Sequence, residues 1–391
     1  MTTDPFRTPE RAALAATVRA FTTDHIAPHV DEWEANGEMP LSLQKEAASL
    51  GLLGVGFPEE VGGSGGDTVD MTIIIEEVLA GGGTGGVVAG MLTHGIATPH
   101  VSDEVLRRRE SGDEAGATYL LERFVRPVLA GEVVASLGVT EPDGGSDVAR
   151  LRTTAARDGD RVVLNGAKTY ITSATRADHV VVAARTGGEG AEGISLIAVP
   201  TDTPGFSITR KLDKMGWRCS DTAEISFSDV SVPAANVLGF EQGFASLARH
   251  FVTERLTLAV TGYATAQRCL DLSTAWVRDR ETFGRPLVTR QVVRHMLAEM
   301  HRQTDIARVY CRDVAARHAD GQQVLLPALL AKTTGVAAGE YVADRAVQLF
   351  GGAGYMTGTE VERHYRDVRI LGIGGGATEV MTDLATRLMG L

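Results

Sequence analysis

The sequence contains few cysteines and no long apolar run, and these two features exclude several classes of protein. Three cysteines occur among 391 residues, at Cys219, Cys269 and Cys311, without a CxxC pair. This spacing predicts neither a disulfide framework nor a bound metal. No apolar stretch reaches the length of a membrane span, and the first residues lack the apolar core of a signal peptide and the Arg-rich character of a transit peptide. We therefore expect no membrane insertion and a location in a reducing cytoplasm.

Positive charge is also in short supply. Lysines and arginines number 38 against 50 aspartates and glutamates, which gives a formal net charge of -12. This balance argues against a nucleic-acid partner, although local arginines can still bind an anionic ligand. A composition of 43% hydrophobic and 23% charged residues is typical of a folded protein, and the length predicts two or three domains that can bury a large cofactor. The abundance of Ala, Arg and Gly indicates a bacterial source.

The periodicity of the apolar residues changes twice along the chain. Helical patterns dominate the first third, strand patterns follow, and long helical patterns return near residue 243. The predicted fold is therefore an α+β multidomain architecture with an N-terminal α-helical domain (1–131), a middle antiparallel β-domain (132–242) and a C-terminal helical bundle (243–391). Because strands do not alternate with helices, a doubly wound nucleotide-binding sheet is disfavoured.

Three local patterns lead to separate expectations. The glycine clusters at 62–66 and 81–86 follow no strand and precede no Gly-Lys-Ser/Thr, so they predict turns or helix ends rather than phosphate loops. The Asn165-Gly166 pair predicts a hairpin turn within 162–172. The segment 102–119 predicts a solvated loop or helix rather than the wall of a ligand pocket.

Glu254 is a carboxylate on the apolar stripe of a predicted helix. It shares helical spacing with Leu247, Phe251, Leu258 and Thr261. Burial disfavours the ionised form and raises the pKa of a carboxyl toward the range that suits proton abstraction near neutral pH. The structural alternative is a partly exposed residue paired with His250 or Arg255.

A glycine-rich run stands at the entry to the predicted β-domain. It reads Leu137-Gly-Val-Thr-Glu-Pro-Asp-Gly-Gly-Ser-Asp147, in which glycines allow close backbone approach to a ligand and hydroxyls offer hydrogen bonds. This run resembles the flavin-binding signature of the acyl-CoA dehydrogenase family, and the resemblance extends over essentially the whole chain. It implies that FAD is the cofactor and that an acyl-CoA is the substrate. The cofactor contacts implied here are Leu137, Val139, Thr140, Gly145 and Ser146, and Ser146 is also implied in substrate binding.

A second match is the run from Asn165 to Ala174, which resembles the family segment that lies against the flavin ring. The resemblance implies that Tyr170 stacks near the ring, that the Thr172 hydroxyl faces flavin N5, and that Ile171 lies in the same contact. The alternative is an ordinary hairpin that carries an aromatic and a β-branched residue.

Two further segments resemble the parts of the family that reach the FAD of a neighbouring subunit. The first, around residues 278–291, implies that Arg280 meets the pyrophosphate while Phe283 and Gln291 lie close by. The second implies contacts at the adenosine end from Gln348, Leu349, Gly351 and Gly352. The alternative for the first segment is a solvated, charged helix end. The resemblance implies a homotetramer, a dimer of dimers in which two chains build each FAD site.

The resemblance also bears on the catalytic base. Many family members carry a catalytic glutamate at the place that Gly375 occupies here. Isovaleryl-CoA and long-chain acyl-CoA dehydrogenases instead carry it in a segment that resembles Thr253-Glu254-Arg255-Leu256. The two substitutions together indicate relocation of the base to Glu254, with Arg255 orienting or balancing the charge of the site. The Gly375 N–H is implied as a hydrogen-bond donor to the thioester carbonyl.

The glycine run and the residues after it complete the implied site. Gly374, Gly375 and Gly376 are implied in substrate binding, and the run predicts extra room for branched or bulky acyl groups. Ala377 and Glu379 match cofactor-contacting positions, and Glu379 is a poorer candidate for the base because it fits the acidic first turn of a helix.

We therefore expect FAD-dependent formation of a trans-2-enoyl-CoA, with Glu254 as base and a separate electron-transfer flavoprotein as acceptor. Three alternatives stay open: the same chemistry on an acyl group held by an acyl-carrier protein, reoxidation of the flavin by oxygen, and a non-catalytic flavoprotein that serves as a binding or assembly module. Acyl chain length, pathway and physiological acceptor are not determined by the sequence.

Overall fold

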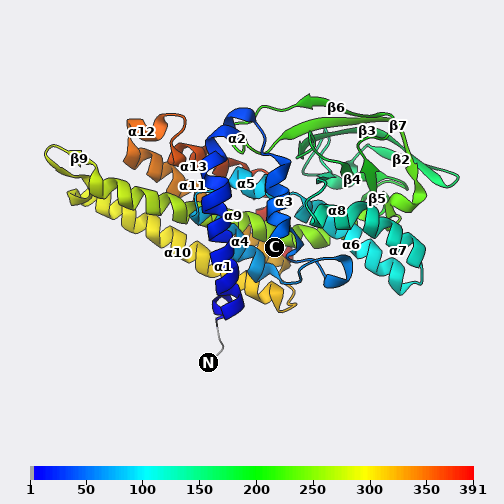
Figure 1. Ribbon diagram of the computed structural model, residues 1–391, viewed down its shortest axis with the longest axis horizontal. Coiled ribbons are helices and arrows are strands. Elements are labelled where there is room, and N and C mark those ends of the chain that lie inside the picture. The colour runs from blue at the N-terminus through cyan, green and yellow to red at the C-terminus, as the bar shows by residue number, and fades with distance from the viewer. Residues whose placement is uncertain (1–3) are drawn as a thin grey trace.

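The computed structural model describes residues 4–391 and consists of two helical regions with a β-sheet between them in sequence (Figure 1). The helices before the sheet and the long helices after it pack together, and the sheet lies at one end of the molecule (Figure 1). The predicted order of helical, β and helical regions is confirmed. The boundaries at 131/132 and 242/243 stay predictions.

The first region is built from eight α-helices. They are α1 (Pro9–Phe21), α2 (Val30–Asn36), α3 (Leu41–Ser49), α4 (Thr68–Ala80), α5 (Gly85–Met91), α6 (His94–Glu110), α7 (Glu114–Leu120) and α8 (Arg126–Leu129). Helix α4 begins at a capping box, in which the side chains of Asp67 and Asp70 each accept a backbone N–H at the helix start. Its isoleucines are buried because α1, α9 and α10 pack around it.

Two expectations for this region have different outcomes. Gly62 ends a short 3-10 helix and Gly81 caps α4, so both glycine clusters lie at turns and helix ends as predicted. The expectation of a solvated loop or helix at 102–119 is met only in part, because the segment is largely helical and residues 110–115 are exposed, but other parts of it are buried. Helices α6 and α7 occupy it, and Val105 and Ala117 are fully buried in a core shared with the sheet. One side of this helix pair is apolar, and the sheet covers it.

The sheet has eight strands. They are β1 (Ala135–Gly138), β2 (Thr154–Asp158), β3 (Arg161–Thr172), β4 (His179–Arg185), β5 (Ile194–Pro200), β6 (Phe206–Lys211), β7 (Thr222–Pro233) and β8 (Val237–Leu238). The path runs β6-β7-β3-β2-β4-β5-β8, with β1 beside β4. Most pairs are antiparallel, but β4 is parallel to both β1 and β2, so the sheet is mixed rather than purely antiparallel.

The hairpin expected at Asn165-Gly166 is not there. The chain turns between β2 and β3, where Gly159 has a φ of +61°, and Asn165 and Gly166 lie inside β3. The pairing of β3 with β7 shifts register between Leu164 and Gly166, and Gly166 has a φ of +147°. Gly166 thus accommodates an irregularity in the pairing of a long strand, which is a common reason for a glycine inside a strand.

The last region is a bundle of long helices. Its α-helices are α9 (Gly243–Asp279), α10 (Gln291–Ala319), α11 (Leu325–Phe350), α12 (Gly352–Tyr355), α13 (Glu360–Val368) and α14 (Thr378–Leu388), and a two-stranded hairpin of β9 (Glu281–Thr282) and β10 (Arg285–Pro286) follows α9. Helices α9 and α11 approach so closely that a Cβ added at Gly262 would collide with the backbone of Gly335. This close crossing brings the middle of α9 against the first half of α11, where the candidate catalytic residues lie.

Within residues 4–391, no helix is both long and apolar enough to cross a membrane. The same range contains no group of three or more side chains that could hold a metal ion. Its three cysteines are free and buried.

Candidate active site

Glu254 and Gly375 face one another, although they lie far apart in the sequence. Glu254 projects from α9, and Gly375 lies in the loop before α14. A Cβ added at Gly375 would come within 3.2 Å of Glu254 Oε1 and would collide with the Leu258 side chain. The Glu254 carboxylate therefore lies next to the point at which a side chain at position 375 would start. Gly375 has a φ of +59°, which is a conformation that favours glycine.

The surroundings of Glu254 favour its protonated form. The residue is half-buried, and its carboxylate takes part in no hydrogen bond within the described chain. Burial raises the pKa of Glu254, while the positive charges of Lys332 and Arg255 lower it by less. His250 is paired with Asp103 at 2.9 Å instead, and no ion pair joins Glu254 to Arg255 in residues 4–391. Glu254 is partly exposed, as the alternative expects, but the pairing with His250 or Arg255 that the alternative requires is not observed.

Arg255 is buried directly beside Glu254. Its guanidinium lies 5.7 Å from the centre of the Phe251 ring, and its Nε has no hydrogen-bond partner in the described part of the chain. Burial lowers the pKa of Arg255, and the charge of Glu254 raises it. A guanidinium remains charged under these conditions, so it can balance a carboxylate at this site.

Lys332 is a member of this cluster that the sequence did not reveal. It is 1% exposed on α11, and its Nζ donates to Gly374 O at 2.6 Å and to Gly376 O. Burial lowers the pKa of Lys332 to about 8, and the charge of Glu254 raises it. The run of Leu, Ala and Gly around Lys332 predicts a buried helix, so a lysine within this run was the available signal of a buried charge with internal partners.

The space around the glycine run is partly filled by neighbouring side chains. The space beside Gly375 is filled by Leu258 and Glu254, and a Cβ at Gly376 would collide with Met381. Gly374 is freer, with Ile370 O at 3.6 Å from the added Cβ. Side chains from α9 and α14 therefore fill the space directly beside two of the three glycines, and the tolerance for branched or bulky acyl groups stays a prediction.

The two predicted flavin segments lie against one another. The Thr169 N–H on β3 donates to Thr140 O at 2.9 Å, and Lys168 Nζ donates to Val139 O at 3.1 Å and to Glu141 Oε1 at 2.8 Å. Glu141 also accepts the backbone N–H groups of Arg152 and Thr153. These bonds hold the pKa of Glu141 at about 2 despite its burial, and burial lowers the pKa of Lys168 to about 8.

Lys168 was also missed in the sequence. It falls on the inward-facing positions of β3 with Val162 and Leu164, and it is fully buried. A lysine at an inward position of a strand is unusual enough to be a signal of an internal partner.

The groups exposed along these segments fit a flavin. The Tyr170 ring is 69% exposed at a φ of +59°. Within residues 4–391, no hydrogen bond is made by the hydroxyls of Thr140, Ser146 or Thr172, so all three are free to bind a polar ligand. Gly145 and Ser146 are exposed, Leu137 and Val139 are partly buried, and Ile171 is buried in the sheet core. A stacking ring beside free hydroxyls suits the aromatic and polar parts of FAD.

Most of the remaining predicted cofactor residues form a second cluster at the other end of the bundle. Phe283 is 97% exposed at the tip of the β9–β10 hairpin, which projects from the molecule in Figure 1, and Arg280 and Gln291 flank it. The Trp276 indole donates to Leu349 O at 3.1 Å and so joins this end of α9 to the end of α11. Gln348, Gly351 and Gly352 are exposed there, while the Leu349 side chain is buried.

The two clusters of one chain lie far apart. At about 1.5 Å per residue, Arg280 lies roughly 39 Å from Glu254 along α9, and Gln348 lies roughly 24 Å from Lys332 along α11. No side chain spans such distances. The last two predicted residues follow Gly375 in the chain: Ala377 is the N-cap of α14, and Glu379 is exposed in its first turn.

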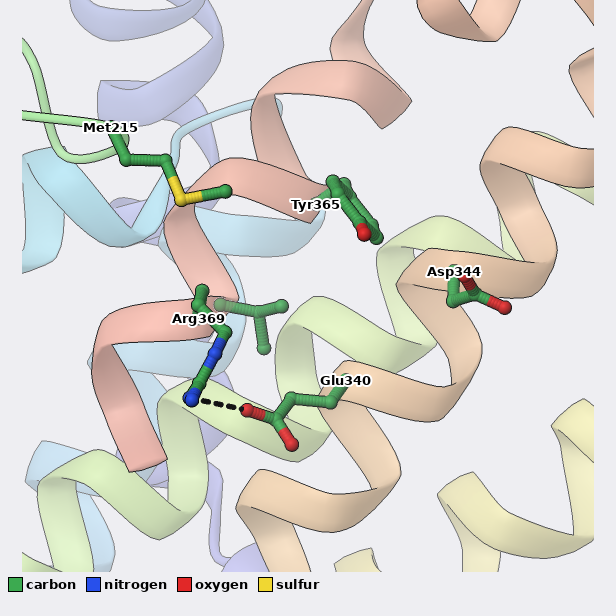
Figure 2. Close-up of a pocket in the computed structure, with 6 residues that line it drawn as sticks. Met215, Glu340, Asp344, Tyr365 and Arg369 are labelled. Carbon is green, nitrogen blue, oxygen red and sulfur yellow. Dashed lines mark hydrogen bonds and ion pairs between the residues drawn. The ribbon is translucent and has the colours of Figure 1, made fainter. Parts of the chain in front are cut away.

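A surface hollow of about 300 Å³ lies between α11 and α13 (Figure 2). Met215, Tyr365 and Arg369 face Glu340 and Asp344 across it, and Arg369 donates to Glu340 at 3.0 Å. It contains none of the predicted site residues.

Comparisons with known proteins show the family to which the chain belongs. Three family models match the chain: Acyl-CoA dehydrogenase, N-terminal domain, over residues 8–105; middle domain, over 136–230; and C-terminal domain, over 241–390. The Bacillus subtilis protein named "Probable acyl-CoA dehydrogenase YngJ" is 37% identical over 97% of this chain and 98% of its own length. The mitochondrial long-chain specific acyl-CoA dehydrogenase of Sus scrofa is 34% identical over 97% of this chain and 86% of its own.

Solved structures give the same result. A crystal structure from Mycobacterium smegmatis assigned to the acyl-CoA dehydrogenases is 56% identical, with a TM-score of 0.94 over 98% of this chain and 99% of that one. Family models that cover most of the chain, together with relatives similar over nearly its full length, show that it belongs to the acyl-CoA dehydrogenase family, whose members are FAD flavoproteins.

Proposed function

We propose that this enzyme converts an acyl-CoA to the trans-2-enoyl-CoA, with Glu254 as the base that removes the α-proton. The observation that carries the proposal is the 3.2 Å between Glu254 Oε1 and a Cβ added at Gly375. A base on α9 and a base on the loop before α14 would therefore serve the same small region. Membership of the family supports acyl-CoA dehydrogenation in general, and this geometry supports the specific base.

The chemistry requires a strong base and a polarised carbonyl. The α-C–H of a thioester is a weak acid, so its removal needs a carboxylate of raised pKa together with hydrogen bonds to the developing oxyanion. The pKa of Glu254 is raised by burial. In our proposal the Gly375 N–H donates to the thioester oxygen, and Arg255 balances the negative charge. When bound, FAD supplies the hydride acceptor for the β-hydrogen.

Two chains are proposed to build each cofactor site. Thr140, Ser146 and Thr172 would bind FAD through their hydroxyls, and Tyr170 would stack on its ring. Because Arg280 and Gln348 lie too far from the Glu254 of their own chain, we propose that a partner subunit supplies that cluster. This supports at least a dimer, and the family resemblance extends the proposal to a homotetramer formed from two such dimers. The cytoplasmic location stays a prediction from the composition.

The acyl group and the electron acceptor belong to the proposal as well. The Sus scrofa relative is named for long-chain substrates, so long-chain acyl-CoAs are the first candidates. We propose an electron-transfer flavoprotein as acceptor, and a rapid reaction of the reduced enzyme with oxygen would favour the oxidase alternative instead. A solved structure named as the prolyl acyl carrier protein oxidase AnaB, 26% identical with a TM-score of 0.90, supports a carrier-protein thioester as the second candidate substrate.

The test is anaerobic bleaching of the bound flavin by a panel of acyl-CoAs and acyl-carrier-protein thioesters. Wild type and Glu254→Gln are compared at equal flavin content. The proposal predicts rapid bleaching by at least one acyl-CoA and a loss of about 10²-fold or more in the variant. Bleaching by carrier-protein thioesters alone would favour the second candidate, and bleaching that survives the substitution would exclude Glu254 as the base. No bleaching of wild type by any thioester would support the non-catalytic alternative.

A further inference from the structure

Lys332 makes contacts that the proposed mechanism has not yet used. Its ammonium is buried between α11, α9 and the loop before α14, and its two hydrogen bonds go to the carbonyls of Gly374 and Gly376, the residues on either side of Gly375. Taking an ammonium out of water costs several kcal/mol unless partners compensate it. Two charged groups face this region, both from α9: Glu254, which attracts the ammonium, and Arg255, which repels it.

The planarity of the peptide bond gives these hydrogen bonds a directional effect. Gly374 C=O and Gly375 N–H belong to one peptide unit, and the described chain contains no cis peptide bond. In a planar trans peptide the carbonyl and the N–H point in opposite directions. A donor that fixes Gly374 O, as Lys332 Nζ does at 2.6 Å, therefore also fixes the direction of the Gly375 N–H, which points away from Lys332. A hydrogen bond to the carbonyl also polarises the N–H of the same unit.

The loop needs such an anchor because its backbone is intrinsically free. Gly374, Gly375 and Gly376 are consecutive, and Gly375 and Gly376 adopt φ values of +59° and +90°. Glycine loses more conformational freedom on ordering than any other residue. The second bond, from Lys332 to Gly376 O, holds the far side of Gly375, so one side chain fixes both ends of the segment.

We propose that Lys332 is a positioning residue that aims the Gly375 N–H at the thioester carbonyl and holds the loop against Glu254. The inference rests on the proposed function, because that function assigns the Gly375 N–H to the substrate. Lys332 itself touches neither the substrate nor the flavin in this account. Its positive charge has a second consequence, since it favours the ionised form of Glu254.

The test compares Lys332→Met with Lys332→Arg and with a matched control. Methionine keeps much of the length and removes the donors and the charge, while arginine keeps both. Lys214 is the control, because it is another lysine with a pKa lowered by burial to about 8 that donates to a backbone carbonyl, that of Ser220, away from the glycine loop. Lys214→Met therefore reports the general cost of removing such a lysine.

Three readouts are measured on flavin-loaded, folded protein. The first is the rate of anaerobic bleaching, which we expect to fall at least about tenfold in Lys332→Met, with the loss in kcat rather than KM, because the donor acts in the transition state. The second is the pH profile of that rate, whose acid limb should move to higher pH once a positive charge beside Glu254 is removed. The third is backbone hydrogen exchange of the 374–377 segment, which should become faster.

The outcomes separate this inference from the proposed function. Partial rescue by Lys332→Arg, with no comparable change in Lys214→Met, would support positioning. A wild-type rate in Lys332→Met, or the same losses in Lys214→Met, would overturn it. If wild type itself is not bleached, the proposed function fails, and hydrogen exchange still decides the anchoring role: unchanged exchange of the loop in Lys332→Met would overturn that too.

Discussion

Moving the carboxylate from position 254 to position 375 is the sharpest test of the geometry described above. Because a Cβ at Gly375 lies 3.2 Å from Glu254 Oε1, a glutamate introduced at 375 would place its carboxylate in the same region. Glu254→Gly alone should slow anaerobic flavin bleaching by roughly 10²- to 10⁴-fold, the usual contribution of a general base. Glu254→Gly combined with Gly375→Glu should recover a substantial part of this loss.

The structure also sets limits on the recovery. A side chain at 375 must adopt a φ of +59°, which costs about 1–3 kcal/mol for a residue other than glycine. It must also displace the Leu258 side chain, and such overpacking typically costs about 1–3 kcal/mol. We therefore expect the double variant to melt at a lower temperature than wild type. The further substitution Leu258→Ala should improve its rate by making room for the new carboxylate.

Gly375→Glu in the presence of Glu254 provides the complementary measurement. Two carboxylates this close cannot both ionise readily, so the pair should titrate with one apparent pKa above that of wild-type Glu254. The acid limb of the bleaching rate should then move to higher pH. The reasoning would be refuted if the double variant, folded and loaded with flavin, were no faster than Glu254→Gly, or if Glu254→Gly bleached as fast as wild type.

Three further predictions follow from the same contacts. Because the pKa of Glu254 is raised in the folded protein, its protonated form stabilises the fold at low pH, and this stability is lost as pH rises through the raised pKa. Glu254→Gln should therefore melt at a higher temperature than wild type at neutral pH and at the same temperature as wild type at acidic pH. Scanning calorimetry of both proteins at the two pH values tests this. Lys168→Met should cost about 3–5 kcal/mol of unfolding free energy and weaken flavin retention, because it leaves Glu141 charged and without its ammonium partner. The double variant Lys168→Met with Glu141→Gln should recover much of the stability, measured by denaturant titration, and much of the flavin retention. Equal losses in the single and double variants would contradict this. Arg280→Ala and Glu254→Gln should each be nearly inactive alone, yet co-expression of the two variant chains should restore flavin bleaching. The reason is that one of the two sites in each mixed dimer receives an intact Glu254 from one chain and an intact Arg280 from the other. Absence of complementation in purified mixed oligomers would place both residues in a single-chain site.

The local elements were predictable because their causes are local. The long helices α10 (Gln291–Ala319) and α11 (Leu325–Phe350) lie in the part of the chain where the apolar periodicity predicts a return to helical structure. The Asn165-Gly166 turn failed because the pair signals a hairpin only when the chain has to reverse there. In β3 the residues before and after the Asn165-Gly166 pair continue the strand, and the glycine accommodates a shift in register against β7.

The candidate site was only partly predictable. Motif resemblance pointed to Glu254, Gly375 and the flavin segments, because those residues carry recognisable types at recognisable spacing. Lys332 and Lys168 were missed, since a lysine in a helical or strand pattern gives no indication of which backbone carbonyl it will meet. The filling of the space beside two of the three glycines was also not predictable, because Leu258 and Met381 come from helices whose packing the sequence does not show.

The sequence by itself therefore determined the order of helical and β regions and the family, and it supplied the side chains that we propose for the chemistry. Tertiary structure alone decided that α9, α11 and the loop before α14 meet, which places Glu254, Lys332 and Gly375 together. It also decided that Arg280 lies at the far end of the same helix as Glu254. The physical reason is that periodicity and turn chemistry act over a few residues, whereas burial, pKa and close contact depend on groups that are distant in the chain and become neighbours only when the helices pack.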